Sequence, residues 1–326
     1  MSTLASGLRV AHPHSIEEAI AARAQNPGSR FLGGGTDLIV NMRRQIDTPN
    51  ALIDLSRVDE MAEIVAKGDI LRIGAGVTIA SLAGDASIAP YKAVVQAAEG
   101  IAGPGHRNMA TVGGNLCQDT RCIYYNQSEW WRSANSFCLK HRGDTCHVAP
   151  QGQRCHAAYS GDLAPALLVF NPEIDIAAPK GCRRMPLADL FVEDGRAHLS
   201  LTEGELVVAV RLPAAPPPSA YAKVRVRGAI DFPLAGVAVA LTSSGGKVGS
   251  LRIALTGTNS RPFLLADTDR FAGRAVDDKL LQEIDRLVQK QVQPMRTTTA
   301  SSNYRRVAAA ALARRLVAQL AGQGAA

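Results

Sequence analysis

Two glycine-rich turns constrain the fold of this 326-residue chain more than any other feature. Gly33-Gly34-Gly35-Thr36-Asp37 follows the β-type residues 30–32 and precedes a helix-like segment, and Thr111-Val112-Gly113-Gly114-Asn115 forms a second such turn. A strand, a glycine turn and a helix in this order present free backbone N–H groups to an anion. Neither turn matches G-x-G-x-x-G, and a lone glycine triplet more often marks a plain tight turn. As a pair, the turns favour a bound diphosphate held mainly by main-chain N–H groups.

The rest of the pattern predicts an α+β chain in more than one domain. Helices are expected over 14–25, where Ser15 is the cap, and over 91–98, 279–292 and 305–320. Strands are expected over 51–55, 70–77, 174–177, 206–212, 221–227, 237–241 and 251–255. The segment Pro213-Ala-Ala-Pro-Pro-Pro-Ser219 has the composition of a stiff linker. We therefore expect one domain over 1–212, a linker over 213–220 and a second domain over 221–326.

Charge and hydropathy narrow the classes of function. The net charge is +7, but the arginine pairs are spread along the chain without a basic cluster, which argues against a nucleic-acid-binding protein and favours a mildly basic docking surface. The N-terminus lacks a continuous apolar signal segment, and no run approaches the roughly 18 apolar residues that span a bilayer. A cytoplasmic protein that does not enter the membrane is the expectation.

Residues 117–159 lose all helical or strand period and contain Cys122, Cys138, Cys146 and Cys155. A loop of this length needs an internal organiser, and cysteines in a cytosolic chain are more often ligands than disulfides. The spacing has no C-x2-C pair, so it is neither a ferredoxin pattern nor a zinc ribbon. Four thiolates can close one tetrahedral site. A zinc site in which His141, His147 or His156 replaces a cysteine, and simple buried thiols, remain alternatives.

Four segments in order resemble the FAD-binding medium subunit of the molybdenum hydroxylases, the xanthine oxidase and carbon monoxide dehydrogenase family. They are FLGGGTDL at 31–38, ATVGGNL at 110–116, SGDLAPALL at 160–168 and YAKVRVR at 221–227. The resemblance implies an α+β fold: a vanillyl-alcohol-oxidase-type FAD-binding domain with lobes at about 1–58 and 59–212, followed by a small C-terminal α+β domain.

The resemblance also implies the residues that hold FAD. The glycine turns would bind the pyrophosphate, Ile101 would contact the flavin ring, Asp162 would bind a sugar or ribityl hydroxyl, and Lys223 would place a positive charge beside the flavin. From the residues alone, Asp162 reads as a helix N-cap and Lys223 as part of a solvated strand face. The full set of expected cofactor residues is Phe31, Leu32, Gly33, Gly34, Gly35, Thr36, Asp37, Ile101, Thr111, Gly113, Gly114, Asn115, Asp162 and Lys223.

Most medium subunits of this family pass almost directly from the second glycine turn to the Asp-bearing segment, whereas this chain inserts about forty residues, at about 117–157. The insertion resembles that of the β subunit of 4-hydroxybenzoyl-CoA reductase, which implies a 4Fe-4S cluster. Its ligands would be Cys122, Cys138, Cys146 and Cys155, with Cys117 and Cys182 as ordinary buried thiols. Tyr124, Tyr125, Trp130 and Trp131 would form an apolar shell around it.

This resemblance implies a multi-subunit enzyme of aromatic degradation that converts 4-hydroxybenzoyl-CoA to benzoyl-CoA. A large subunit would carry molybdopterin and a small subunit two 2Fe-2S clusters, and the resemblance allows a dimer of heterotrimers. The present chain would pass electrons from ferredoxin, through the 4Fe-4S cluster and FAD, toward the molybdenum subunit. Two alternatives stay open: a molybdenum hydroxylase or dehydrogenase subunit that passes electrons to NAD or another acceptor, and a zinc-stabilised nucleic-acid-binding module.

Overall fold

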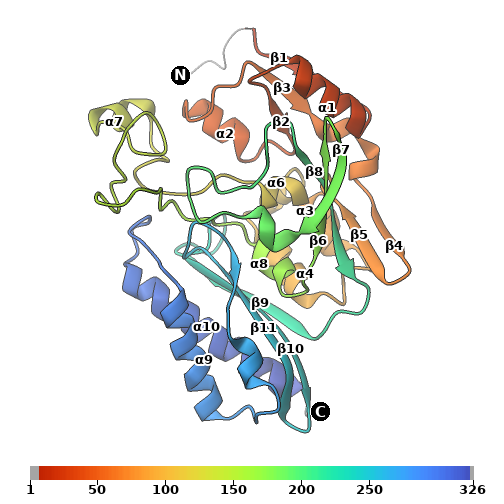
Figure 1. Ribbon diagram of the computed structural model, residues 1–326, viewed down its shortest axis with the longest axis vertical. Helices are drawn as coiled ribbons and strands as arrows, with labels where there is room; N and C mark the ends of the chain where they lie inside the picture. The colour runs from red at the N-terminus through yellow and green to blue at the C-terminus, as the bar shows by residue number, and fades with distance from the viewer. Residues whose placement is uncertain (1–6, 324–326) are drawn as a thin grey trace.

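The computed structural model describes residues 7–323 and places three β-sheets in one molecule (Figure 1). The N-terminal lobe has a parallel sheet of order β1-β3-β2, built from β1 (Arg9–Ala11), β2 (Arg30–Leu32) and β3 (Ala51–Asp54). Helix α1 (Ile16–Gln25) joins the first two strands, and Ser15 caps it by accepting a hydrogen bond from Glu18 N, as expected. Helix α2 (Leu38–Arg43) leaves the first glycine turn.

The second lobe is built on a five-stranded antiparallel sheet of order β4-β5-β8-β6-β7. Helices α4 and α8 lie between this lobe and the C-terminal sheet (Figure 1). The strands are β4 (Ile64–Lys67), β5 (Ile70–Gly74), β6 (Glu173–Ala178), β7 (Gly181–Pro186) and β8 (Leu206–Pro213). The helices are α3 (Ile79–Gly84), α4 (Lys92–Gly100), α5 (Pro104–Arg107), α6 (Val112–Leu116) and α8 (Leu163–Leu168). Short 3-10 turns cover Leu55–Arg57, Asp59–Met61 and Leu187–Leu190.

The C-terminal part contains an antiparallel sheet of order β12-β11-β10-β9 and two long helices. Successive residues of its central strand belong to two different cores: Val237 and Val239 face the helices, whereas Ala238 and Ala240 join the core of the second lobe. Because side chains alternate along a strand, both faces of this sheet are buried. The elements are β9 (Ser219–Val224), β10 (Ala235–Ser244), β11 (Lys247–Thr256), β12 (Phe263–Leu264), a 3-10 turn (Thr268–Phe271), α9 (Asp278–Gln291) and α10 (Ser302–Gln323).

Two local expectations were wrong. Residues 225–227 do not continue the strand, which ends at Val224, because the chain turns there and Asp231 accepts hydrogen bonds from the Val226 and Arg227 N–H groups. The insertion is not wholly irregular, since it contains helix α7 (Glu129–Ala134), which Ser128 caps. The insertion lies to one side of the molecule in Figure 1, beside α2 and above the C-terminal helices. Within residues 7–323, no helix is both long and apolar enough to cross a membrane.

Candidate FAD and cysteine sites

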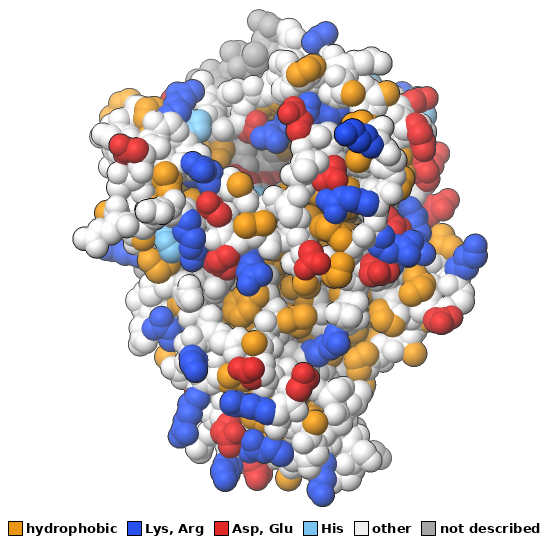
Figure 2. Space-filling model, in the orientation of Figure 1, with side chains coloured by type: hydrophobic (Ala, Val, Ile, Leu, Met, Phe, Trp, Pro, Cys, Tyr) orange, Lys and Arg blue, Asp and Glu red, His pale blue; other side chains and the backbone are white. Residues whose placement is uncertain are grey.

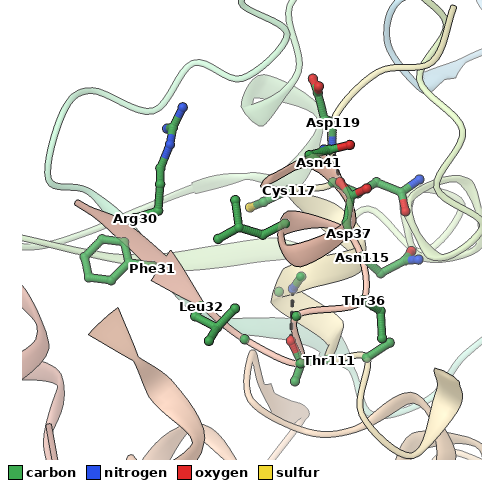
Figure 3. Close-up of a pocket in the computed structure, with 18 of the residues that line it drawn as sticks. Arg30, Phe31, Leu32, Thr36, Asp37, Asn41, Thr111, Asn115, Cys117 and Asp119 are labelled. Atoms are coloured by element: carbon green, nitrogen blue, oxygen red, sulfur yellow. Dashed lines mark hydrogen bonds between the residues drawn. The ribbon is translucent and has the colours of Figure 1, made fainter. Parts of the chain in front are cut away.

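A cavity of about 1450 Å³ opens between the N-terminal lobe, the second lobe and the segment after β9. Its volume exceeds the roughly 300–1,000 Å³ of ordinary small-molecule pockets. Every expected cofactor residue except Lys223 lines it. Figure 3 shows Phe31, Leu32, Thr36 and Asp37 from the first turn and its flanks beside Thr111 and Asn115 from the second. The structure therefore brings together two sequence motifs that lie about seventy positions apart in the chain.

The glycines of the first turn are required chiefly because the two turns pack against each other. A Cβ at Gly34 would overlap the Met109 carbonyl group, and a Cβ at Gly33 would lie 2.8 Å from Thr111 Oγ1. Gly35 has a φ of +71°, which favours glycine for conformational reasons. Contact between the turns thus explains glycine at 33 and 34 without any ligand.

The two turns differ in the donors that they offer. Among the described residues, the N–H groups of Gly34, Gly35 and Thr36 find no acceptor. At the second turn, Gly113 N donates to the Ala75 carbonyl group at 2.8 Å, and Gly114 N donates to Thr111 Oγ1 at 3.1 Å. Backbone N–H groups left without a protein partner are available to an anion. The first turn therefore has more free main-chain donors than the second, which was not evident from the sequence.

Asp37 connects the first turn to the insertion. Its carboxylate forms an ion pair with Arg121 and accepts a hydrogen bond from Asp119 N at 3.0 Å. Figure 3 shows Asp37, Asp119 and Asn41 gathered at this end of the cavity. A carboxylate next to a bound diphosphate would repel it, and the Arg121 guanidinium offsets this negative charge.

Asp162 and Lys223 form a buried pair with side chains that are each 6 % exposed, and Lys223 Nζ lies 2.8 Å from Asp162 Oδ1. The Tyr221 hydroxyl donates to the same oxygen at 2.6 Å. Burial raises the pKa of Asp162, and the Lys223 ammonium opposes that rise. Asp162 makes no capping bond to α8, and Leu163 N at the start of that helix donates to Asn115 Oδ1. Lys223 is buried behind Asp162, so neither residue matches its simpler sequence interpretation.

Sequence reasoning missed the segment that covers part of the cavity. Residues 227 and 230–232, which follow β9, line part of the same cavity. Phe232 stacks under Arg121, whose guanidinium carbon lies 4.6 Å from the ring centroid. Ile230 N donates to the Ala102 carbonyl group at 3.3 Å, next to Ile101. Gly228 and Pro233 in this segment were the available signals that the strand pattern ends.

The four expected cysteine ligands converge. All four are buried, and they line one small cavity together with Tyr124, Tyr125, Lys140 and His147. Burial raises the pKa of the Cys122 thiol to about 12 and that of Cys155 to about 11, and at Cys155 the nearby Lys140 ammonium opposes the rise. The cavity measures about 10 Å³, so the side chains would have to turn outward to admit a four-iron group.

Other parts of the cysteine prediction need correction. Within the described residues, no group of three or more His, Cys, Asp or Glu side chains is arranged to hold a metal ion, which gives no support to the expected four-cysteine cluster site or to a zinc site. Cys182 is exposed and Cys117 is only half-buried, so neither is an ordinary buried thiol. Trp130 is 76 % exposed and lies outside the apolar shell, because α7 turns it to solvent. Trp131 packs on Tyr124 with ring centroids 6.3 Å apart.

Comparison with known proteins agrees with this geometry. Residues 6–215 match the model of the FAD binding domain in molybdopterin dehydrogenase, and residues 219–320 match the CO dehydrogenase flavoprotein C-terminal domain. The chain is 34 % identical to the aldehyde oxidoreductase FAD-binding subunit PaoB of Escherichia coli K12, over 77 % of this chain and 81 % of that protein. It is 27 % identical to the carbon monoxide dehydrogenase medium chain of Afipia carboxidovorans, over 94 % and 93 %.

The fold agrees as well. The crystal structure of Cu,Mo-CO dehydrogenase in its cyanide-inactivated form matches with a TM-score of 0.79 at 25 % identity, over 98 % of this chain and 99 % of that one. The expected fold, an α+β FAD-binding domain followed by a smaller C-terminal domain, is therefore confirmed. The chain belongs to the family of FAD-binding flavoprotein subunits of the molybdenum hydroxylases, which includes the medium chains of CO dehydrogenases.

Proposed function

We propose that this chain is the electron-transfer subunit of a molybdenum enzyme and binds FAD in the large cavity and a 4Fe-4S cluster in the insertion. The observation that carries the proposal is the convergence of four buried cysteines beside the cavity that the two glycine turns form. A large molybdopterin subunit and a small 2Fe-2S subunit would complete the enzyme, as a dimer of heterotrimers. The limits proposed for its parts are 1–212, 213–220 and 221–326, with the insertion at about 117–157.

The residues present fit FAD. The free N–H groups of Gly34, Gly35 and Thr36 would hold the diphosphate, and Ile101, which is 7 % exposed, would pack against the ring system. Asp162 Oδ1 already binds Lys223 and Tyr221, which leaves Oδ2 for a sugar or ribityl hydroxyl. Lys223 would act by holding Asp162 in place. When bound, FAD supplies a group that exchanges electrons singly or in pairs.

The resemblance of the insertion is the reason for proposing a cluster rather than zinc. A single zinc ion draws its thiolates to about 2.3 Å from one centre, whereas a four-iron cube binds each thiolate at a separate corner. The four thiols line one common cavity of about 10 Å³, and within the described residues no three ligand side chains are arranged for one ion, so either group would require the cysteine side chains to move. A bound cation would also overcome the raised thiol pKa values, because metal binding drives deprotonation of its cysteine ligands.

Two substrates are candidates. The insertion's resemblance favours reductive dehydroxylation of 4-hydroxybenzoyl-CoA, with ferredoxin as the electron donor. The 34 % identity to a subunit named for aldehyde oxidation favours an aldehyde, with electrons passing outward to NAD or another acceptor. Turnover assays of the purified complex would separate them: benzoyl-CoA formed with reduced ferredoxin supports the first, and aldehyde-dependent reduction of an acceptor supports the second.

A nucleic-acid-binding role has less support. Figure 2 shows Lys and Arg side chains interspersed with Asp and Glu on the displayed face, without the continuous basic surface that nucleic acid requires. The mixed charges suit docking of a protein partner.

Cofactor analysis of the anaerobically purified complex tests the proposal. The partner subunits contribute their own iron, so Cys138→Ser should lower the total by about four iron atoms per copy of this chain, as expected for a 4Fe-4S site. Cys182→Ser, at an exposed cysteine away from both cavities, is the matched control and should keep all of its iron. Wild-type iron in the Cys138→Ser complex would overturn the cluster, and absence of FAD from the wild-type complex would overturn the flavin site.

A further inference from the structure

Tyr125 and Lys140 line both the large cavity and the small cysteine cavity. Both belong to the insertion: Tyr125 follows Cys122 by three positions, and Lys140 follows Cys138 by two. We call these two side chains the shared wall. Among the described residues that line the two cavities, these two are the ones that line both, so they lie where the cavities adjoin.

The shared wall is buried and tightly held. The Lys140 side chain is 5 % exposed, and its ammonium nitrogen lies 4.3 Å from the centroid of the Tyr125 ring. Lys140 Nζ also lies 2.5 Å from Asp119 Oδ1 and donates to Thr120 Oγ1 at 2.5 Å. A lysine side chain is seldom buried unless its ammonium group has a specific partner. The ammonium charge is therefore fixed at the boundary between the cavities.

The charges around this ammonium group form a short chain. Asp119, whose side chain is 25 % exposed, faces Lys140, and Arg121 pairs with Asp37 on the other side of Asp119. His198 also lies near Lys140 and Asp119. Screening by water is weak at a buried site, so each of these charges acts on its neighbours more strongly than a surface charge would.

Reduction adds negative charge to a bound redox group, so a nearby positive charge raises its reduction potential and a nearby negative charge lowers it. Transfer across the shared wall moves one electron and no atoms: the donor group is oxidised by one electron and the acceptor is reduced by one. The wall's charges thus act on the energetics of the transfer without taking part in bond chemistry.

We propose that Lys140 and Asp119 are positioning residues that set the reduction potentials of the groups in the two cavities, at the point where electrons cross between them. Lys140 raises these potentials and Asp119 lowers them. The inference rests on the function proposed above.

A redox titration of the anaerobic three-subunit complex tests it, with the flavin followed by absorbance and the four-iron cluster by its electron paramagnetic resonance spectrum. Lys140→Met should lower the potential of at least one of the two groups, and Asp119→Asn should raise the potential of that same group. A general loosening of the loop would instead shift the reduction potentials of both variants in the same direction. Lys180→Met removes an exposed lysine from the turn between β6 and β7 and should leave both potentials at their wild-type values.

Unchanged potentials in both variants, or shifts of the same sign, overturn the inference if FAD and iron contents match the wild type; the proposed function then stands. If Lys140→Met releases either group, the variants Lys140→Arg and Asp119→Asn test the inference instead. Lys140→Arg should keep the wild-type potentials, and Asp119→Asn should still raise the reduction potential of one group. A wild-type complex without the four-iron cluster overturns the proposed function itself, and the inference with it.

Discussion

The buried guanidinium group of Arg132 donates a hydrogen bond from Nη2 to the carbonyl oxygen of Gln45 at 2.9 Å, and a second to that of Arg44 at 3.1 Å. Arg132 belongs to α7 in the insertion, and residues 44 and 45 directly follow α2. At the other end of α2, the insertion's Arg121 pairs with Asp37. The insertion therefore holds both ends of the helix that leaves the first glycine turn, so the folding of the cysteine loop and the shape of the FAD cavity are linked.

Arg132→Ala should weaken both stability and FAD retention. The side chain is 1 % exposed, pairs with Glu129 at 2.7 Å and donates to the Arg44 and Gln45 carbonyl groups. A buried acceptor that loses its partner costs about 1–3 kcal/mol. We expect a lower thermal unfolding midpoint of the complex. We also expect a higher dissociation constant for FAD, measured from the fluorescence of the flavin that the complex releases.

Arg142→Ala is the matched control, because Arg142 pairs with the same Glu129 at 2.6 Å but its side chain is 59 % exposed. An exposed pair of this kind contributes about 1 kcal/mol or less. Equal FAD affinity in the Arg132→Ala and wild-type complexes would show that the insertion does not support the cavity.

Gly34→Ala should disrupt the contact between the two glycine turns. Its Cβ would overlap the Met109 carbonyl group, so one turn must move, and the free N–H groups beside position 34 would move with it. We expect loss of most of the bound FAD. In Gly105→Ala the new Cβ meets no atom within 4 Å, so this variant should keep its FAD and be slightly stabilised, by about 0.4–1 kcal/mol. The ratio of flavin to protein in the two purified variants tests this prediction. Full FAD occupancy in Gly34→Ala would contradict it.

The parts of the site that the sequence predicts are those encoded locally. The glycine turns, the Thr111 hydroxyl that caps α6 and the Ser15 cap of α1 each depend on a few consecutive residues. The segments that carried the family resemblance are likewise short runs of consecutive residues. This is why the residues of the large cavity, Lys223 excepted, could be predicted from the sequence.

The parts that could not be predicted depend on contacts between distant positions. The pairing of Asp162 with Lys223 joins the second lobe to the C-terminal sheet, and Arg132 meets the end of α2 across nearly ninety residues. The periodicity of hydrophobic residues along the sequence does not indicate such distant partners. Cys182 was expected to be buried because free cysteine commonly is, but it lies on β7, an edge strand with mostly exposed side chains.

Lys223→Met should make the stability of the protein strongly dependent on pH. Burial already raises the pKa of Asp162, and loss of the ammonium group that opposes it should raise the pKa further. An acid with a raised pKa binds more protons in the folded state than in the unfolded chain, so stability falls as the pH rises above the usual aspartate range. We expect a loss of about 3–5 kcal/mol at neutral pH, partly recovered on acidification. Denaturant titrations at several pH values measure it.

The double variant Asp162→Asn, Lys223→Met is the control for this effect. It removes both charges of the pair, so the extra pH dependence should disappear. A double variant that keeps the pH profile of Lys223→Met would mean that another group causes it.

His198 should make the protein less stable in mild acid. Burial and the nearby Lys140 ammonium lower the pKa of His198 to about 4, and its Nε2 atom lies 2.9 Å from the Gln118 carbonyl oxygen. The unfolded chain, where the imidazole titrates near 6.5, binds the proton more readily than the folded state. Stability is therefore full above pH 6.5 and falls as the pH drops toward 4, by about 3 kcal/mol in total. His198→Gln keeps a side-chain donor for Gln118 but has no group that titrates in this range, so its unfolding free energy should change less over that interval. Parallel profiles for the variant and the wild type, from denaturant titrations between pH 7 and 4, would assign the acid sensitivity to other groups.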